Sequence, residues 1–313
     1  MREELNAVRP VILQLDDSLT RQPALEAHVR ARGGRVMGAQ DLGPALRLWS
    51  GEATLEILKR RLAAELPECG EADLVFAGSG DFHHVTPLML ERALAQASQP
   101  VTLIHFDNHP DWIRFARGRH CGSWVGRAAR LPGVARVITV GVTSRDIGAA
   151  KAHEGDLALI AEGKLDMFAW EAPDGRDEVV LEGRAWPTVA AMGETAFLDR
   201  LAAEIPTSAV YVTLDKDVLR AEDAVTNWDQ GRASLDFVAQ AVRRIAGGRR
   251  LVGADVVGDW SKPVYGGGAT AALLKRGEAL LDQPWRRPEP GRADRVNEAV
   301  NLRLLELFLE SAA

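Results

Sequence analysis

The regular alternation of short apolar segments with amphipathic segments most constrains the fold of this 313-residue chain. Strands covered by helices on both faces are apolar almost throughout, whereas helices on a sheet show apolar residues at spacings of three and four. The sequence predicts strands at 10–15, 73–78, 101–107, 136–142, 209–215 and 251–257, and helices at 55–66, 87–97, 194–205, 235–247 and 296–311. We therefore expect an α/β fold, a three-layer sandwich with a mostly parallel central sheet.

Two segments depart from this alternation. Residues 161–190 contain the turn-forming sequence APDGRD at 172–177, which predicts an excursion with a hairpin. Residues 284–292 are rich in proline and arginine and predict an exposed connector before the last helix. Neither segment resembles a linker between domains, so we expect a single domain over residues 1–313.

The composition argues against several classes of protein. The formal net charge of −6 offers no basic surface for nucleic acid or for an anionic membrane. The apolar runs are too short to span a membrane, and the N-terminal residues lack the apolar stretch of a signal peptide. The chain has two cysteines, Cys69 and Cys121, too few for a disulfide framework or a cysteine-rich zinc site. We therefore expect a cytoplasmic protein.

Polar side chains gather where three of the expected strands end. Carboxylates and imidazoles together are typical ligands of manganese, and alternate residues of an extended segment face the same side. A single aspartate at a strand end is more often a turn or helix cap, and a single histidine more often packs in the core. Five of the seven histidines fall between residues 83 and 120, however, and this clustering favours a metal site. The candidate ligands are Asp81, His83, His84, Asp107, His109, Asp111, Asp215 and Asp217.

The three clusters resemble, in the same order and at similar separations, the signature motifs of the ureohydrolase family, the arginases and agmatinases. The family motifs GGDHS, DAHxD and SxDxDxxDP correspond here to GDFHHVTPL, HFDNHPDW and VTLDKDVL, so the resemblance covers about residues 73–260. It implies an arginase-like fold and two manganese ions per chain. One ion would be held by His83, Asp107, Asp111 and Asp215, and the other by Asp107, His109, Asp215 and Asp217. The residue inserted into the first motif leaves His84 as the alternative to His83.

The resemblance also implies roles around the metals. Asp107 and Asp215 would bridge the ions, Asp107 would also take part in catalysis, and His120 matches the family's proton-shuttling histidine. The family's guanidinium-binding glutamate aligns with Gly258, which leaves Asp259 and Asp229 as candidates for substrate binding. Arg114 lies where family members contact the far end of the substrate. Capping, turn formation and a solvated loop remain the alternative explanations for these three residues.

The implied reaction is hydrolysis of a linear carbon–nitrogen bond in a guanidino compound, with release of urea. An arginine-like compound, an agmatine-like compound and an arginine-containing peptide remain open as substrates. Because the aligned glutamate is absent, a metal-dependent amidohydrolase or deacetylase is the alternative enzyme, and a non-catalytic metal-binding protein is the alternative outside enzymes. The family implies a homo-oligomer, while the final helix is equally compatible with a monomer.

Overall fold

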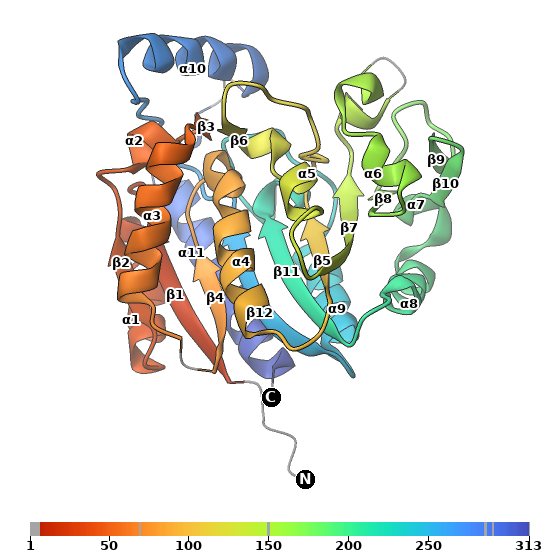
Figure 1. Cartoon of the computed structure of the whole chain (residues 1–313), viewed down its shortest axis with the longest axis horizontal. Coiled ribbons are helices and arrows are strands. Elements are labelled where there is room, and N and C mark those ends of the chain that lie inside the picture. The colour runs from red at the N-terminus through yellow and green to blue at the C-terminus, as the bar shows by residue number, and fades with distance from the viewer. Residues whose placement is uncertain (1–6, 69, 149–150, 285–286, 290, 313) are drawn as a thin grey trace.

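A parallel sheet of eight strands forms the centre of the molecule (Figure 1). The computed structural model describes residues 7–68, 70–148, 151–284, 287–289 and 291–312. Across the sheet the strands run in the order β2-β1-β4-β12-β11-β5-β7-β8. Their bounds are β1 (Val8–Gln14), β2 (Arg35–Gly38), β4 (Ala72–Phe76), β5 (Val101–Phe106), β7 (Val134–Val142), β8 (Leu165–Ala169), β11 (Ala209–Asp215) and β12 (Arg250–Val257).

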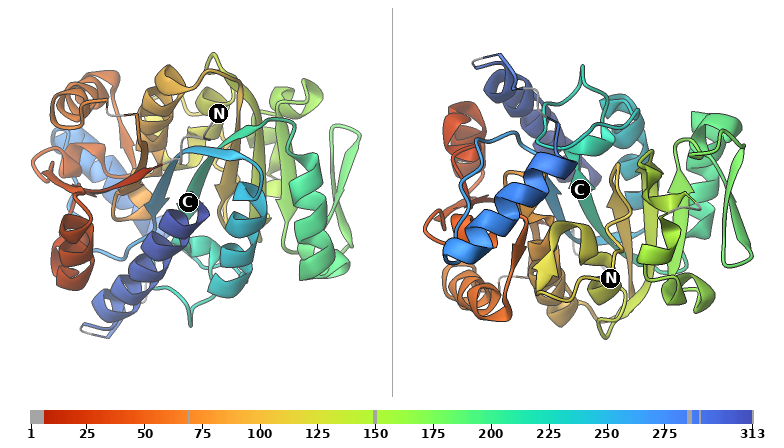
Figure 2. Two further views of the ribbon diagram at one scale, coloured as in Figure 1. Left: turned by 90° about the horizontal axis from the view of Figure 1, so that it is seen from below. Right: turned by 90° about the horizontal axis from the view of Figure 1, so that it is seen from above.

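Helices cover both faces of this sheet, which gives the expected three layers (Figure 2). One face carries α1 (Pro23–Ala31), α11 (Arg292–Ser311), α9 (Leu235–Ala246) and α8 (Glu194–Glu204), which pack side by side in that order. The opposite face carries α3 (Glu52–Glu65), α4 (Thr86–Gln96) and α5 (Val125–Ala128). The structure confirms the α/β class with a parallel central sheet.

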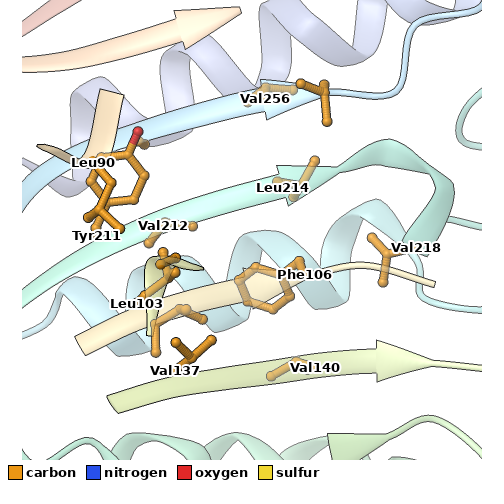
Figure 3. Close-up of a cluster of buried hydrophobic side chains, with 14 of the residues drawn as sticks. Leu90, Leu103, Phe106, Val137, Val140, Tyr211, Val212, Leu214, Val218 and Val256 are labelled. Atoms are coloured by element: carbon orange, nitrogen blue, oxygen red, sulfur yellow. The ribbon is translucent and has the colours of Figure 1, made fainter. Parts of the chain in front are cut away.

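The core lies where the central strands meet the two helical layers. Every residue of β5 and β11 is buried, as their almost continuous apolar sequences predict. Figure 3 shows side chains such as Leu103, Phe106, Val212 and Leu214 packed between these strands and their neighbours. This packing gives the carboxyl ends of β5 and β11 a rigid base.

The order of the strands creates a crevice at one edge of the sheet. Strands β4 and β5 belong to consecutive motifs of the sequence, but β12 and β11 are inserted between them. Such a reversal of strand order leaves an opening beyond the carboxyl ends, where α/β proteins bind their ligands. The three polar clusters follow β4, β5 and β11, so all three border this opening.

The remaining elements are mostly short. A lone helix, α10 (Ala269–Asp282), lies across the carboxyl-terminal side of the sheet (Figures 1 and 2). The smaller helices and strands are α2 (Gly43–Leu46), β3 (Trp49–Ser50), β6 (Arg119–His120), α6 (Ala158–Ala161), β9 (Glu178–Leu181), β10 (Arg184–Pro187) and α7 (Val189–Met192). The 3-10 helices are η1 (Leu19–Arg21), η2 (Gly80–Val85), η3 (Cys121–Ser123), η4 (Arg145–Ile147), η5 (Ala152–Glu154) and η6 (Lys216–Val218).

All six predicted strands and all five predicted helices are present, with ends that differ by a few residues. The segment 161–190 is only partly an excursion, because β8 joins the edge of the central sheet before the expected hairpin forms from β9 and β10. Strand β2 and helices α1 and α10 were not predicted. Of the predicted connector 284–292, residues 285–286 and 290 lie outside the described residues.

None of the helices in the described part of the chain combines the length and apolar character needed to cross a lipid bilayer.

Candidate metal centre and pocket

Each polar cluster is shaped by a tight turn immediately after its strand. After β4, the Ser79 hydroxyl accepts a hydrogen bond from the backbone amide of Asp81 and caps η2, which carries His83. After β11, the Asp215 carboxylate accepts a hydrogen bond from the backbone amide of Asp217 and caps η6 in the same way. After β5, Asp111 adopts a φ of 47°, a conformation that costs energy for residues other than glycine and is concentrated at functional sites.

One group of side chains converges on His83. Its Nδ1 lies 3.1 Å from Oδ2 of Asp107, 3.1 Å from Oδ2 of Asp111 and 3.7 Å from Oδ2 of Asp215. His105 joins them, because its Nε2 lies 2.9 Å from Oδ2 of Asp107. One ligand atom from each of His83, His105, Asp107 and Asp111 falls within 4.8 Å of all the others, a spacing that one metal ion can bridge.

A second group shares Asp107 with the first. Nδ1 of His109 lies 3.0 Å from Oδ2 of Asp217 and 3.5 Å from Oδ1 of Asp107. These three residues again offer ligand atoms within 4.8 Å of one another. Two adjoining sets of ligands with Asp107 in common are the arrangement that a pair of metal ions requires.

Burial makes the cluster electrostatically unbalanced without a cation. Burial and the charge of Asp107 raise the pKa of Asp215 to about 7. Burial and the charges of Asp107 and Asp215 likewise raise the pKa of Asp217 well above its usual value. Although burial opposes it, contact with His105, His109 and His83 holds the pKa of Asp107 well below its usual value. So many carboxylates removed from water are stabilised best by an added positive charge.

The donor set fits hard divalent ions. Nδ1 of His83 is buried and makes no hydrogen bond within the described residues, although three carboxylates face it, so the ring nitrogen is oriented as a ligand atom. Its Nε2 is hydrogen-bonded to Thr213 Oγ1 at 2.9 Å, the kind of second contact that orients metal-bound histidines. Carboxylate and imidazole ligands without thiolates suit manganese better than a structural zinc site.

Glycines make room for the Asp215 carboxylate. A Cβ at Gly80 would lie 2.4 Å from Asp215 Oδ2, and a Cβ at Gly258 would lie 2.4 Å from Asp215 Oδ1. Gly258 also has a φ of +97°, which side-chain-bearing residues rarely adopt. A Cβ at Gly258 would also lie 2.5 Å from the backbone nitrogen of Lys216, so the structure has no room there for the glutamate of the family motif.

A pocket of about 610 Å³ opens above the cluster. Asp107, His109, Asp111, Asp215 and Asp217 form part of its wall. The remainder includes His120, Cys121, Trp228 and Asp229, the charged residues Arg145, Asp146, Lys151 and Glu154, and Leu281 and Asp282 from α10. The pocket therefore joins the candidate metal ligands to a polar and mainly acidic mouth.

Of the six proposed metal ligands, His83, Asp107, His109, Asp111 and Asp217 fall within the two groups. Asp215 belongs to neither group, although its Oδ2 lies 3.7 Å from Nδ1 of His83. Both ring nitrogens of His84 are buried without a hydrogen bond among the described residues, and His84 belongs to neither ligand group. His105 is not among the ligands predicted from the sequence. Only its place on β5, two residues before Asp107 and therefore on the same face, hinted at the contact that it makes.

The residues proposed to bind substrate are placed differently from one another. Asp229 lines the pocket, but its Oδ1 lies 3.0 Å from Nε2 of His109, so it orients that ring. Asp259 is buried away from the pocket wall and forms an ion pair with Lys216 at 2.9 Å. Arg114 is exposed and donates a hydrogen bond to the backbone carbonyl of His153, also outside the pocket wall. Of the three, only Asp229 lines the pocket.

Solved structures of arginase-like enzymes share this fold. Arginase from Bacillus caldovelox matches with a TM-score of 0.60 at 16% identity, over 95% of this chain and 97% of that one. Formimidoylglutamase from Bacillus subtilis matches with a TM-score of 0.59 at 14% identity, over 99% and 89%. A hypothetical agmatinase from Burkholderia thailandensis matches with a TM-score of 0.58 at 16% identity, over 97% and 86%. The architecture is therefore arginase-like, as the sequence motifs predicted.

Comparisons of sequence alone find less similarity to known proteins than the comparison of folds. No protein-family model matches the chain. An uncharacterized protein of Thermotoga maritima is 26% identical over 186 residues, a match that spans 59% of this chain and 58% of that relative. The chain is thus far from the characterised enzymes in sequence, although it has their fold.

Proposed function

We propose that this chain is a divergent ureohydrolase that cleaves a linear carbon–nitrogen bond in a guanidino compound and releases urea. The observation that carries the proposal is the pair of ligand groups that share Asp107 at the floor of a pocket, on an arginase-like fold. We propose manganese as the metal, with two ions per chain held by His83, Asp107, His109, Asp111, Asp215 and Asp217. Such ions would act as Lewis acids and lower the pKa of a water molecule at the cluster.

The chain's own residues would bind the substrate and handle its protons. The carboxylates of the pocket mouth, among them Asp146, Glu154 and Asp282, attract a cationic substrate. His120 lies in the pocket wall, and we assign to it the transfer of a proton to the departing amine nitrogen. Asp229 holds the His109 ring and lines the pocket, which supports it as the carboxylate that binds the guanidinium. We propose small guanidino compounds or arginine-containing peptides as substrates.

The direct test is release of urea by the manganese-loaded protein from arginine, agmatine, other guanidino acids and an arginine-containing peptide. We expect urea from one of these substrates and none from an Asp107→Ala variant. Absence of urea from the whole panel, with the metals bound, would refute the proposed reaction.

A metal-dependent amidohydrolase is the second candidate. It is favoured by Gly258, where no side chain fits, and by Asp259, whose carboxylate is committed to Lys216. An enzyme of this kind needs no carboxylate for a guanidinium and releases a carboxylate product instead of urea. Assays of N-acetyl and formyl amides on the same protein distinguish the two, and metal binding without any turnover would instead indicate a non-catalytic protein.

A further inference from the structure

Helix α10 covers the pocket with very little packing of its own. Lys275 is the one buried side chain in this helix, whereas Leu273, Leu274, Leu280 and Leu281 are exposed. Lys275 donates a hydrogen bond to the backbone carbonyl of Ala45, and Gln283, just after the helix, donates one to Asp81. Gly267 and Gly268, both with positive φ, lead into the helix. Figures 1 and 2 show α10 lying across the carboxyl-terminal side of the sheet. The contacts that hold it there are mainly polar.

The most informative of these contacts is made by Glu278. One of its carboxylate oxygens, Oε1, accepts a hydrogen bond from Nε2 of His120. The other, Oε2, accepts a hydrogen bond from the indole nitrogen of Trp49 at 3.1 Å. Both oxygens are therefore used, and the carboxylate cannot turn without losing one of its partners.

The opposite edge of the His120 ring fixes its tautomer. Nδ1 accepts a hydrogen bond from the backbone amide of Gly122 at 2.8 Å, so it carries a lone pair and no proton. The single ring proton of the neutral form is then on Nε2, where it is donated to Glu278. Nδ1 is the nitrogen that can take up a proton, on the edge of the ring near Gly122 and Cys121, which also line the pocket.

We propose that Glu278 is the positioning residue of a His120–Glu278 dyad, and that docking of α10 completes this dyad. The proposal rests on the proposed function, because it assigns the proton-handling atom of that reaction. Glu278 holds the ring by Nε2–H and leaves Nδ1 to act. A carboxylate in this place also stabilises the imidazolium that forms when Nδ1 is protonated, as the aspartate does in hydrolase triads, although here the two ring nitrogens exchange roles.

The protons balance in this scheme. The Gly122 amide gives up its hydrogen bond to Nδ1. A water O–H bond breaks, its proton forms a bond to Nδ1, and the oxygen adds to the guanidino carbon. The N–H bond at Nδ1 then breaks as the carbon–nitrogen bond is cleaved, and the proton passes to the departing amine. His120 returns to its starting tautomer with Nε2–H still on Glu278.

Glu278→Gln is the principal test, because the amide oxygen still accepts from Nε2–H while the negative charge is lost. We expect kcat to fall by roughly 100-fold or more, the usual contribution of acid–base catalysis, with KM and metal content near those of the parent protein. Trp49→Phe removes the second partner of the carboxylate and is expected to lower kcat less. Arg276→Gln, on the exposed side of the same helix, is the matched control and should leave kcat unchanged.

A second measurement does not depend on activity. Long-range proton–nitrogen NMR spectra of histidine-labelled full-length protein report the tautomer of each ring, and the signals of His120 are assigned by their loss in His120→Asn. We expect the Nε2–H form in the parent protein and a mixture of tautomers in Glu278→Ala. A pure Nδ1–H form in the parent would overturn the dyad even if urea is released.

The kinetic outcomes are equally decisive. The proposal is wrong if Glu278→Gln and Trp49→Phe both keep the kcat of the parent protein. It is also wrong if Glu278→Gln raises KM and leaves kcat unchanged, because Glu278 would then be a substrate-binding residue. If the parent releases no urea but His120 shows the Nε2–H tautomer that depends on Glu278, the proposed reaction fails while the dyad stands.

Discussion

Replacing Asp259 with asparagine separates a structural role of this residue from a role in binding substrate. The Asp259 carboxylate is 1% exposed and pairs with the fully buried ammonium of Lys216 at 2.9 Å. Gln22, which lies between η1 and α1, donates a hydrogen bond to the Asp259 carboxylate at 2.7 Å. Asn301 of α11 accepts a hydrogen bond from Lys216 and donates one to Asp259. Asp259→Asn keeps the shape of the side chain and removes the charge, so Lys216 is left buried without a counter-ion.

The expected cost follows from this burial. Breaking a buried ion pair by removing one partner destabilises a protein by about 3–5 kcal/mol, because the remaining charge is not compensated. For a large domain, such a loss lowers the melting temperature by roughly 10 °C. The pKa of Lys216 is already lowered by burial, which Asp259 only partly offsets, so the ammonium depends on this carboxylate. In the double variant Lys216→Met and Asp259→Asn no charge is left unpaired, and we expect part of the stability to return.

Thermal and urea unfolding of the two single variants and the double variant measure this cost, and steady-state kinetics below the melting transition measure KM. We expect a large loss of stability in Asp259→Asn and an unchanged KM for guanidino substrates. Parent-like stability together with a raised KM would refute this reasoning and would restore Asp259 as the residue that binds the guanidinium.

Three further outcomes are expected. Asp107→Ala should weaken the binding of both ions by more than about 100-fold, because loss of a shared ligand should exceed the usual effect of replacing a residue that only hydrogen-bonds to a ligand. Elemental analysis that still finds full metal occupancy would refute a shared ligand. Because burial beside Asp107 raises the pKa of Asp215 to about 7, a metal ion must displace a proton. Metal affinity should therefore rise as the pH increases through about 7, and competition titrations that show no dependence on pH would contradict this. Burial raises the pKa of the Cys121 thiol well above its usual value, so iodoacetamide should label Cys121 only after unfolding. Peptide mass spectrometry that finds the label on Cys121 of the native protein would contradict this.

The central strands and the metal ligands could be predicted because their signals are local. The strands β5 and β11 are mostly apolar, and each runs directly into its carboxylates. Once parallel strands are expected, Asp107 and Asp215 are expected at the same edge of the sheet, and the pairing of β5 with β11 brings them together. The edge strand β2 is short and only partly buried, so its pattern is weaker, and β8 lies in the segment 161–190, whose turn residues predict an excursion.

The parts of the site that depend on distant segments could not be predicted. Helix α10 contributes Glu278 from 158 positions beyond His120, and its sequence has exposed leucines in place of a regular apolar face. Nothing in the sequence around Asp259 indicates that Lys216 takes its carboxylate, because that pairing depends on how β12 and β11 lie side by side. Close approach of the backbone at Gly258 to Asp215 is likewise a property of the folded sheet.

The proposed function depends above all on whether the cluster around Asp107 holds two metal ions. Elemental analysis of the full-length protein, purified, loaded with manganese and freed of excess metal, measures this directly. We expect two ions per chain in the parent protein, and the loss of one of them in His109→Ala, which removes a ligand from one group only. A protein that binds no metal under these conditions, or that binds the same amount after His109→Ala and Asp107→Ala, would contradict the dinuclear centre on which the proposed function rests.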